Sequence, residues 1–104
     1  MDEQKFIDAF DNWLVACQKL IDDEFSKNYP NLDVPTLQAN VGRKYMKVIK
    51  VESQRSVFAF IDLSNGDVLK PAGWSRPAKH ARGNLFDDEG GMGQMTSYGP
   101  KYLR

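Results

Sequence analysis

The chain has 104 residues, with 14 acidic side chains, 14 basic side chains and one cysteine. This length suits one small domain built around a single core. One cysteine excludes an internal disulfide and a cysteine-rich metal site, and we expect no cofactor, no metal and no catalytic residues. We find no secretory signal pattern and no apolar run long enough to cross a bilayer, which favours a cytoplasmic protein without membrane contact.

The zero net charge conceals a segregation of acidic and basic residues along the chain. Residues 1–25 carry seven acids against two lysines, whereas residues 26–86 carry ten basic residues against four acids. A protein with this polarity can present a basic face to a polyanion. It can equally pack an acidic helix beside a basic sheet with no partner. The sequence leaves both interpretations open.

Residues 1–26 predict an amphipathic α-helix, because their apolar side chains recur every three or four residues and form one stripe. Pro30 predicts the end of the helix, since proline disfavours helical geometry in the preceding residue. Residues 30–42 are predicted to be a connector that could include a short helical turn after Pro35. The stripe consists of Phe6, Ile7, Phe10, Trp13, Leu14, Cys17, Leu20, Ile21 and Phe25.

Residues 43–74 predict an antiparallel β-meander. Residues 45–51 and 57–63 are rich in β-branched and aromatic side chains. The pair Asn65-Gly66 is typical of a two-residue type I′ hairpin, which places Leu63 opposite Val68. The chain therefore predicts an α+β fold, in which the N-terminal helix packs on a three- or four-stranded antiparallel sheet.

Both faces of this hairpin are apolar, although one helix can cover only one face of a sheet. The tail, a second chain or a ligand must then cover the other face, and Phe58 and Phe60 are our candidate interface for a homodimer or a host protein. The predicted alternation places Val57, Ala59, Ile61, Leu63 and Val68 on one face, and Phe58, Phe60 and Leu69 on the other.

Residues 75–104 are expected to form an irregular basic loop and a partly ordered tail. Residues 70–86 contain no acidic side chain. Single-stranded nucleic acids are bound by basic side chains along the backbone and by aromatic rings against the bases. The alternative is that Trp74 plugs the core and that the arginines pair with the acids of residues 87–89. Our candidate nucleic-acid contacts are Lys44, Lys47, Lys50, Arg76, Lys79 and Arg82, with Tyr45 and Trp74 as stacking residues.

His80 could serve an enzyme as a general base or metal ligand, and the acidic run at residues 87–89 could hold a divalent cation, but we favour neither interpretation. His80 is the single histidine of the chain and has no recognisable partner for a triad or a zinc site. The acidic run lacks the alternating spacing of a calcium loop, so we expect a solvated turn.

The C-terminal half, residues 53–104, contains the segments FAFID, NGDVLKPAGW, PAKHARGN and YGPKYLR. These segments resemble a family of short proteins encoded by tailed bacteriophages, marine ones included. The resemblance implies the cytoplasm of an infected bacterial cell. By analogy with other small phage proteins, our leading hypothesis is a non-catalytic accessory protein that binds single-stranded DNA or RNA. The alternative is a protein–protein interaction module.

Overall fold

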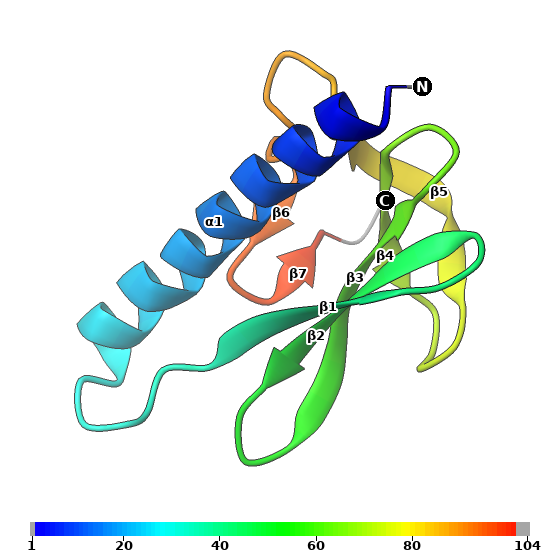
Figure 1. Ribbon diagram of the computed structural model, residues 1–104. Helices are drawn as coiled ribbons and strands as arrows, with labels where there is room; N and C mark the ends of the chain where they lie inside the picture. Colours follow the sequence, from blue (N-terminus) through cyan, green and yellow to red (C-terminus); the bar gives the residue numbers. More distant parts are fainter. Residues whose placement is uncertain (1, 102–104) are drawn as a thin grey trace.

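The computed structural model describes residues 2–101, which form one helix packed against a five-stranded antiparallel sheet. The predicted α+β fold is confirmed, with more strands than expected. Figure 1 shows α1 against one face of the sheet, which we call the inner face; the opposite face is the outer face. The elements are α1 (Glu3–Asn28), β1 (Thr36–Val41), β2 (Tyr45–Val51), β3 (Arg55–Asp62), β4 (Asp67–Pro71), β5 (Pro77–Asn84), β6 (Met95–Thr96) and β7 (Gly99–Pro100).

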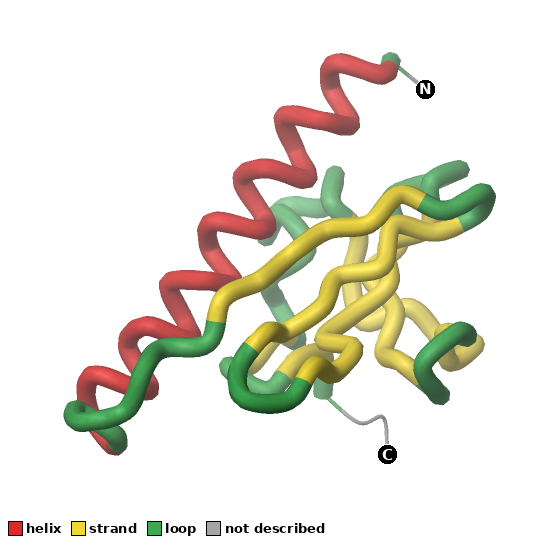
Figure 2. The backbone as a smooth tube through the Cα atoms, turned by 60° about the horizontal axis from the view of Figure 1, so that its bottom comes forward, coloured by secondary structure: helices red, strands yellow, loops and turns green. Residues whose placement is uncertain are grey.

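The sheet follows the order of the chain from β1 to β5, and β6 pairs with β7 in a separate two-stranded sheet. Each strand of the larger sheet is antiparallel to its neighbour. β1 and β5 are therefore the two edge strands. Figure 2 shows how the strands of this sheet twist relative to α1.

The helix confirms the predicted amphipathic stripe, except that Ile7 is exposed. The carboxylate of Asp2 accepts hydrogen bonds from the backbone amides of Gln4 and Lys5 and caps the N-terminus. Within residues 2–101 no helix is both long enough and apolar enough to span a bilayer. The buried helix residues are Phe6, Phe10, Trp13, Cys17 and Ile21.

The inner core joins this stripe to the sheet and the tail. Trp13 is 1% exposed and packs edge-to-face on Phe58, with ring centroids 6.4 Å apart. Cys17 Sγ lies 3.7 Å from Met92 Sδ. Burial of the Cys17 thiol raises its pKa to about 12, so the thiol is a core group.

Two strands replace segments that the sequence predicted to be irregular. β1 lies within the predicted connector, and no helical turn follows Pro35; β5 lies within the predicted basic loop. A strand at the edge of a sheet can carry small, polar and charged side chains, so it need not show the apolar pattern from which strands are predicted. β5 also begins with Pro77, a position where strands tolerate proline.

A β-bulge in β3 reverses the predicted orientation of Phe58. Ile49 pairs with Val57 while the residue before Ile49 pairs with Ala59, so Phe58 is the extra residue. Phe58 joins Ala59 in the core beneath α1, whereas Phe60 stays on the outer face. The prediction that Phe58 and Phe60 share a face is wrong.

The β3–β4 hairpin is wider than a two-residue turn. Gly66 has φ of 82°, but no described non-glycine residue has a positive φ, which excludes a type I′ turn at Asn65. Ile61, and not Leu63, pairs with Val68. The predicted β3–β4 register is wrong by two residues, and a shift of two residues does not by itself turn a side chain to the other face.

The described part of the tail packs on the inner face. Met95 belongs to the core beneath α1, and β7 contacts β3 and β4. The carbonyl of Pro100 accepts a hydrogen bond from Lys70 Nζ, 3.0 Å away. The tail therefore covers the same face as the helix (Figure 1). The end of the predicted tail, residues 102–104, lies outside the described residues.

Candidate nucleic-acid interface

The apolar side chains on the outer face are covered by aromatic and basic side chains of the same face. Ile49, Phe60 and Leu69 are each no more than 6% exposed. The ring of Tyr45 packs edge-to-face on Phe60, with centroids 5.9 Å apart. Lys47 pairs with Phe60 across β2 and β3 and holds its Nζ 5.9 Å from the ring centroid. The aliphatic stem of a lysine can cover apolar surface while its ammonium group stays in water.

Trp74 reaches this face from the β4–β5 hairpin. The amides of Ala72 and Gly73 donate to the carbonyl of Arg76, at 2.9 and 3.2 Å, and close the hairpin loop. The loop brings the Trp74 ring to 4.5 Å from the Nζ of Lys47, which lies on β2 beyond β3. Trp74 is still 51% exposed. It is therefore not a core plug, and much of its indole surface faces solvent.

A groove of about 330 Å³ lies on the outer face beside the β1–β2 turn. Arg43, Lys44 and Lys47 make it basic, and Tyr45 and Phe60 give it an aromatic surface. A second hollow, which adjoins it through the residues of the turn, contains the carboxylate of Asp62. Among the described residues no carboxylate lines the groove itself. Its complete lining is Asn40, Val41, Gly42, Arg43, Lys44, Tyr45, Lys47, Phe60 and Ser75.

The structure brings four of the predicted contacts together at this groove. Lys44, Tyr45 and Lys47 line it, and Trp74 stands over Lys47. Arg76 is exposed in the same hairpin loop as Trp74. Within residues 2–101, none of the basic side chains of this group forms an ion pair with a carboxylate.

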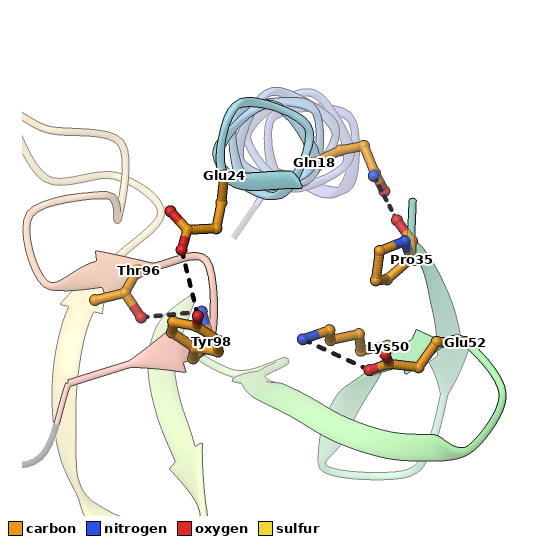
Figure 3. A network of polar contacts seen from close by, with 7 residues as sticks. All are labelled: Gln18, Glu24, Pro35, Lys50, Glu52, Thr96 and Tyr98. Carbon is orange, nitrogen blue, oxygen red and sulfur yellow. Dashed lines mark hydrogen bonds and ion pairs between the residues drawn. The ribbon is translucent and has the colours of Figure 1, made fainter. Parts of the chain in front are cut away.

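Lys50 lies on the other side of the sheet. Its Nζ is 3.7 Å from a carboxylate oxygen of Glu52 and 5.4 Å from the ring centroid of Tyr98. The hydroxyl of Tyr98 donates to Glu24 of α1, at 3.3 Å, and the carboxylate of Glu24 raises the pKa of Tyr98. Figure 3 shows Lys50 pointing into this inner-face network. Lys50 is therefore separated from the predicted contacts at the groove.

Arg82 is buried and serves the tail. It is 7% exposed; its Nε donates to the carbonyl of Lys101 at 3.1 Å, and its Nη1 donates to the carbonyl of His80 at 2.5 Å. Burial and the nearby Arg82 lower the pKa of Lys70. Lys79 is exposed on β5. Of the predicted contacts on β5, Lys79 is thus accessible to a ligand and Arg82 is not.

The predicted apolar interface is closed within a single chain. Phe58 and Phe60 are each 2% exposed, on opposite faces of the sheet. Neither ring presents an apolar patch that a second chain would have to cover. This removes the observation on which the predicted homodimer interface rested.

The acidic run after β5 organises a turn. One carboxylate oxygen of Asp87 accepts hydrogen bonds from the amides of Glu89 and Gly91, both at 2.9 Å, and the other accepts from the amide of Asn84 at 3.0 Å. These hydrogen bonds, the one from Gly91 first, lower the pKa of Asp87. The arginines of the basic segment do not pair with this carboxylate in the described residues.

The charge segregation of the sequence becomes a segregation between layers. The acidic helix lies on the inner face, whereas the basic groove lies on the outer face. Among residues 2–101 the two ion pairs, Lys19–Asp23 and Lys50–Glu52, each join near neighbours in the chain, and neither links α1 to the sheet. The helix therefore does not neutralise the groove.

Residues 3–99 match the model of a family of unknown function, DUF7717. The chain belongs to this family. The match spans α1, the whole five-stranded sheet and most of the described tail, so the family shares the helix as well as the hairpin. No curated protein and no solved structure matches the chain.

The sequence analysis of this DUF7717 member did not identify three polar residues of the groove, Asn40, Arg43 and Ser75. Arg43 lines both hollows, and Asn40 and Ser75 line the groove alone. A signal for Arg43 was present, because it precedes Lys44 in the short link between two strands. Asn40 was not recognisable, since its segment was not predicted to be a strand.

Proposed function

We propose that the protein is a non-catalytic binder of single-stranded nucleic acid and that the outer-face groove is its binding site. The observation that supports this is the combination, on one face, of a half-exposed indole and cationic side chains that form no ion pair with a carboxylate of residues 2–101. In line with the resemblance of the C-terminal half, we place this activity in a phage accessory protein acting in the cytoplasm of an infected bacterium.

Each part of the groove has a separate role in this proposal. Arg43, Lys44 and Arg76 contact phosphates, which neutralises charge and releases counterions. Trp74 offers its free indole surface to one base, an interaction that any base can make. Lys47 engages the indole from the sheet side and holds it over the groove. Stacking of this kind needs an unpaired base, which favours a single strand over a duplex.

The first experiment is fluorescence anisotropy of labelled single-stranded DNA and RNA 12-mers, titrated at several salt concentrations. We expect binding that weakens with salt, with a slope of roughly −0.7 per phosphate contact. Changing Lys44→Gln and Arg76→Gln together should lower the affinity and flatten the slope by about 1.4. Trp74→Ala should cost about 1–3 kcal/mol of binding with an unchanged slope, because a base stack carries no counterions.

The matched control removes two positive charges from the opposite layer. Lys5 and Lys27 are exposed on α1, so the double change Lys5→Gln and Lys27→Gln alters the net charge by the same amount. We expect this variant to bind nearly as the parent does. Equal losses in both double variants would show that net charge alone drives binding. Absence of binding at about 50 mM salt, where phosphate contacts are strong, would refute the proposal.

A further inference from the structure

The free edge of β1 offers backbone groups for pairing. The amide of Gly42 donates to the carbonyl of Tyr45 at 2.9 Å, so this opposed pair is hydrogen-bonded across the β1–β2 turn. In an antiparallel ladder, such pairs alternate with pairs whose backbone groups point away. Leu37, Ala39 and Val41 therefore direct their N–H and C=O groups to the open edge.

One end of this edge is already paired by a side chain. The amide of Gln18 accepts from the backbone N–H of Leu37 at 3.0 Å and donates to the carbonyl of Pro35 at 2.9 Å. Figure 3 shows Gln18 reaching from α1 to Pro35. The side-chain amide thus supplies the donor and the acceptor that a neighbouring strand would supply. Within residues 2–101 no side chain pairs with the backbone groups of Ala39 and Val41 in this way, and both residues are exposed.

The open end of the edge adjoins an apolar hollow. Val41 is 74% exposed and Ile7 is 43% exposed, and both line a hollow of about 360 Å³ between the start of α1 and the sheet. Large apolar side chains exposed together beside an unpaired strand edge are unusual in a protein that has no partner there. The full lining is Asp2, Glu3, Phe6, Ile7, Val41, Met46 and Leu63.

The helix gives this edge a negative flank. Gln18 marks the side of α1 that faces β1, and Ile7 and Asp11 fall on the same side at helical spacing. Asp11 is exposed, and two further acids, Asp2 and Glu3, line the hollow. A second copy of this chain that paired through β1 would bring its own Asp2, Glu3 and Asp11 beside these acids. Charge complementarity therefore favours a basic partner over self-association.

We propose that the β1 edge is a docking site for an extended peptide of another protein that adds a strand antiparallel to β1. Ala39 and Val41 supply the backbone hydrogen bonds. Alternate side chains of the peptide point toward α1, where an apolar one enters the hollow beside Ile7 and basic ones face Asp11. This surface meets the groove at Val41, which lines both the groove and the hollow, but the proposal rests on no nucleic-acid contact.

The probe is a labelled peptide of sequence Thr-Ile-Thr-Lys-Thr-Lys, whose Ile and Lys side chains share one face of a strand. The matched probe replaces both lysines by glutamate. Binding is followed by anisotropy, and amide hydrogen exchange locates it. We expect the basic peptide to bind more tightly than the acidic one and to slow exchange at Ala39 and Val41. Exchange at Leu37, whose amide Gln18 already holds, should change least.

Two charge reversals on α1 separate the docking site from general attraction to the acidic helix. Asp11→Lys should weaken the basic peptide about fivefold, the equivalent of one exposed ion pair. Asp23→Lys makes the same charge change about 120° further around the helix, at a residue that pairs with Lys19, and should leave the affinity nearly unchanged. Equal effects of the two variants would overturn the site, and so would protection of amides elsewhere than Ala39 and Val41. Protection of these two amides that rises with protein concentration alone would show that a second copy, and not a peptide, fills the edge.

Discussion

Asp87 shows how one carboxylate can shape a loop that its sequence would leave undefined. Its oxygens accept three backbone amides within residues 84–91, so the turn after β5 is organised around one side chain. Three acids in a row predicted only a solvated turn. The network explains which of the three is structural, because in the described part of the chain these amides donate to Asp87 and not to Asp88 or Glu89.

We predict that Asp87→Asn lowers the free energy of unfolding at pH 7 and makes it less dependent on pH in the acidic range. The folded pKa of Asp87 lies below its unfolded value near 3.9, so its contribution is complete above that value and is lost as pH falls through the folded pKa. The loss at pH 7 should be roughly 1 kcal/mol, a charged hydrogen-bond value discounted for exposure. Urea unfolding at pH 7, 4 and 2.5 tests this. An unchanged difference between parent and variant at all three pH values would contradict it.

At the scale of the elements, the sequence predicted those helices and strands that have a regular pattern of apolar side chains. The helix and β2 follow directly from apolar periodicity, and their observed bounds are close to the expected ones. β1 and β5 were not predicted, because backbone pairing on one side can hold an edge strand without an apolar pattern in its sequence. The bulge at Phe58 was not predicted, because one extra residue in a strand changes its pairing and leaves its β-rich composition as it was. That single residue decides which aromatic ring lies under the helix and which lies beneath the groove.

The sequence predicted which types of residue form the candidate site, but not which individual residues of those types lie in it. Tyr45, Lys47 and Trp74 were identified because basic and aromatic side chains in a predicted sheet favour nucleic-acid binding. Lys50 and Arg82 belong to the same types. Their exclusion depends on which face of the sheet each side chain occupies and on contacts with the tail, which spacing along the chain does not reveal.

β7 depends on a glycine that no other residue can replace without strain. A Cβ on Gly99 would lie 2.7 Å from the carbonyl oxygen of Phe58, and Gly99 has φ of 110°. We predict that Gly99→Ala destabilises the protein by about 1–3 kcal/mol, the usual range for a forced backbone conformation. Gly73→Ala is the control, because nothing lies within 4 Å of its Cβ position. Thermal unfolding of both variants tests this, and equal melting temperatures would refute it.

At the scale of the whole molecule, the two tryptophans report on opposite layers. Trp13 is 1% exposed in the inner core, whereas Trp74 is 51% exposed on the outer face. We predict that iodide quenches Trp74 selectively and that single-stranded DNA protects it, because a stacked base covers the indole. The variant Trp74→Phe should lose both the quenchable fraction and the protection. Strong quenching that persists in this variant would mean that the inner layer is open to solvent.

The contact between Cys17 and Met92 joins parts of the chain that are 75 residues apart. Ribosomes add about 5–20 residues per second, so roughly 4–15 seconds separate the synthesis of the two side chains. During that interval the apolar stripe of α1 is finished and its partners in the tail do not yet exist. Met92 and Met95 therefore complete a core that residues of α1 began, and this core closes only after the segment that contains them has been made.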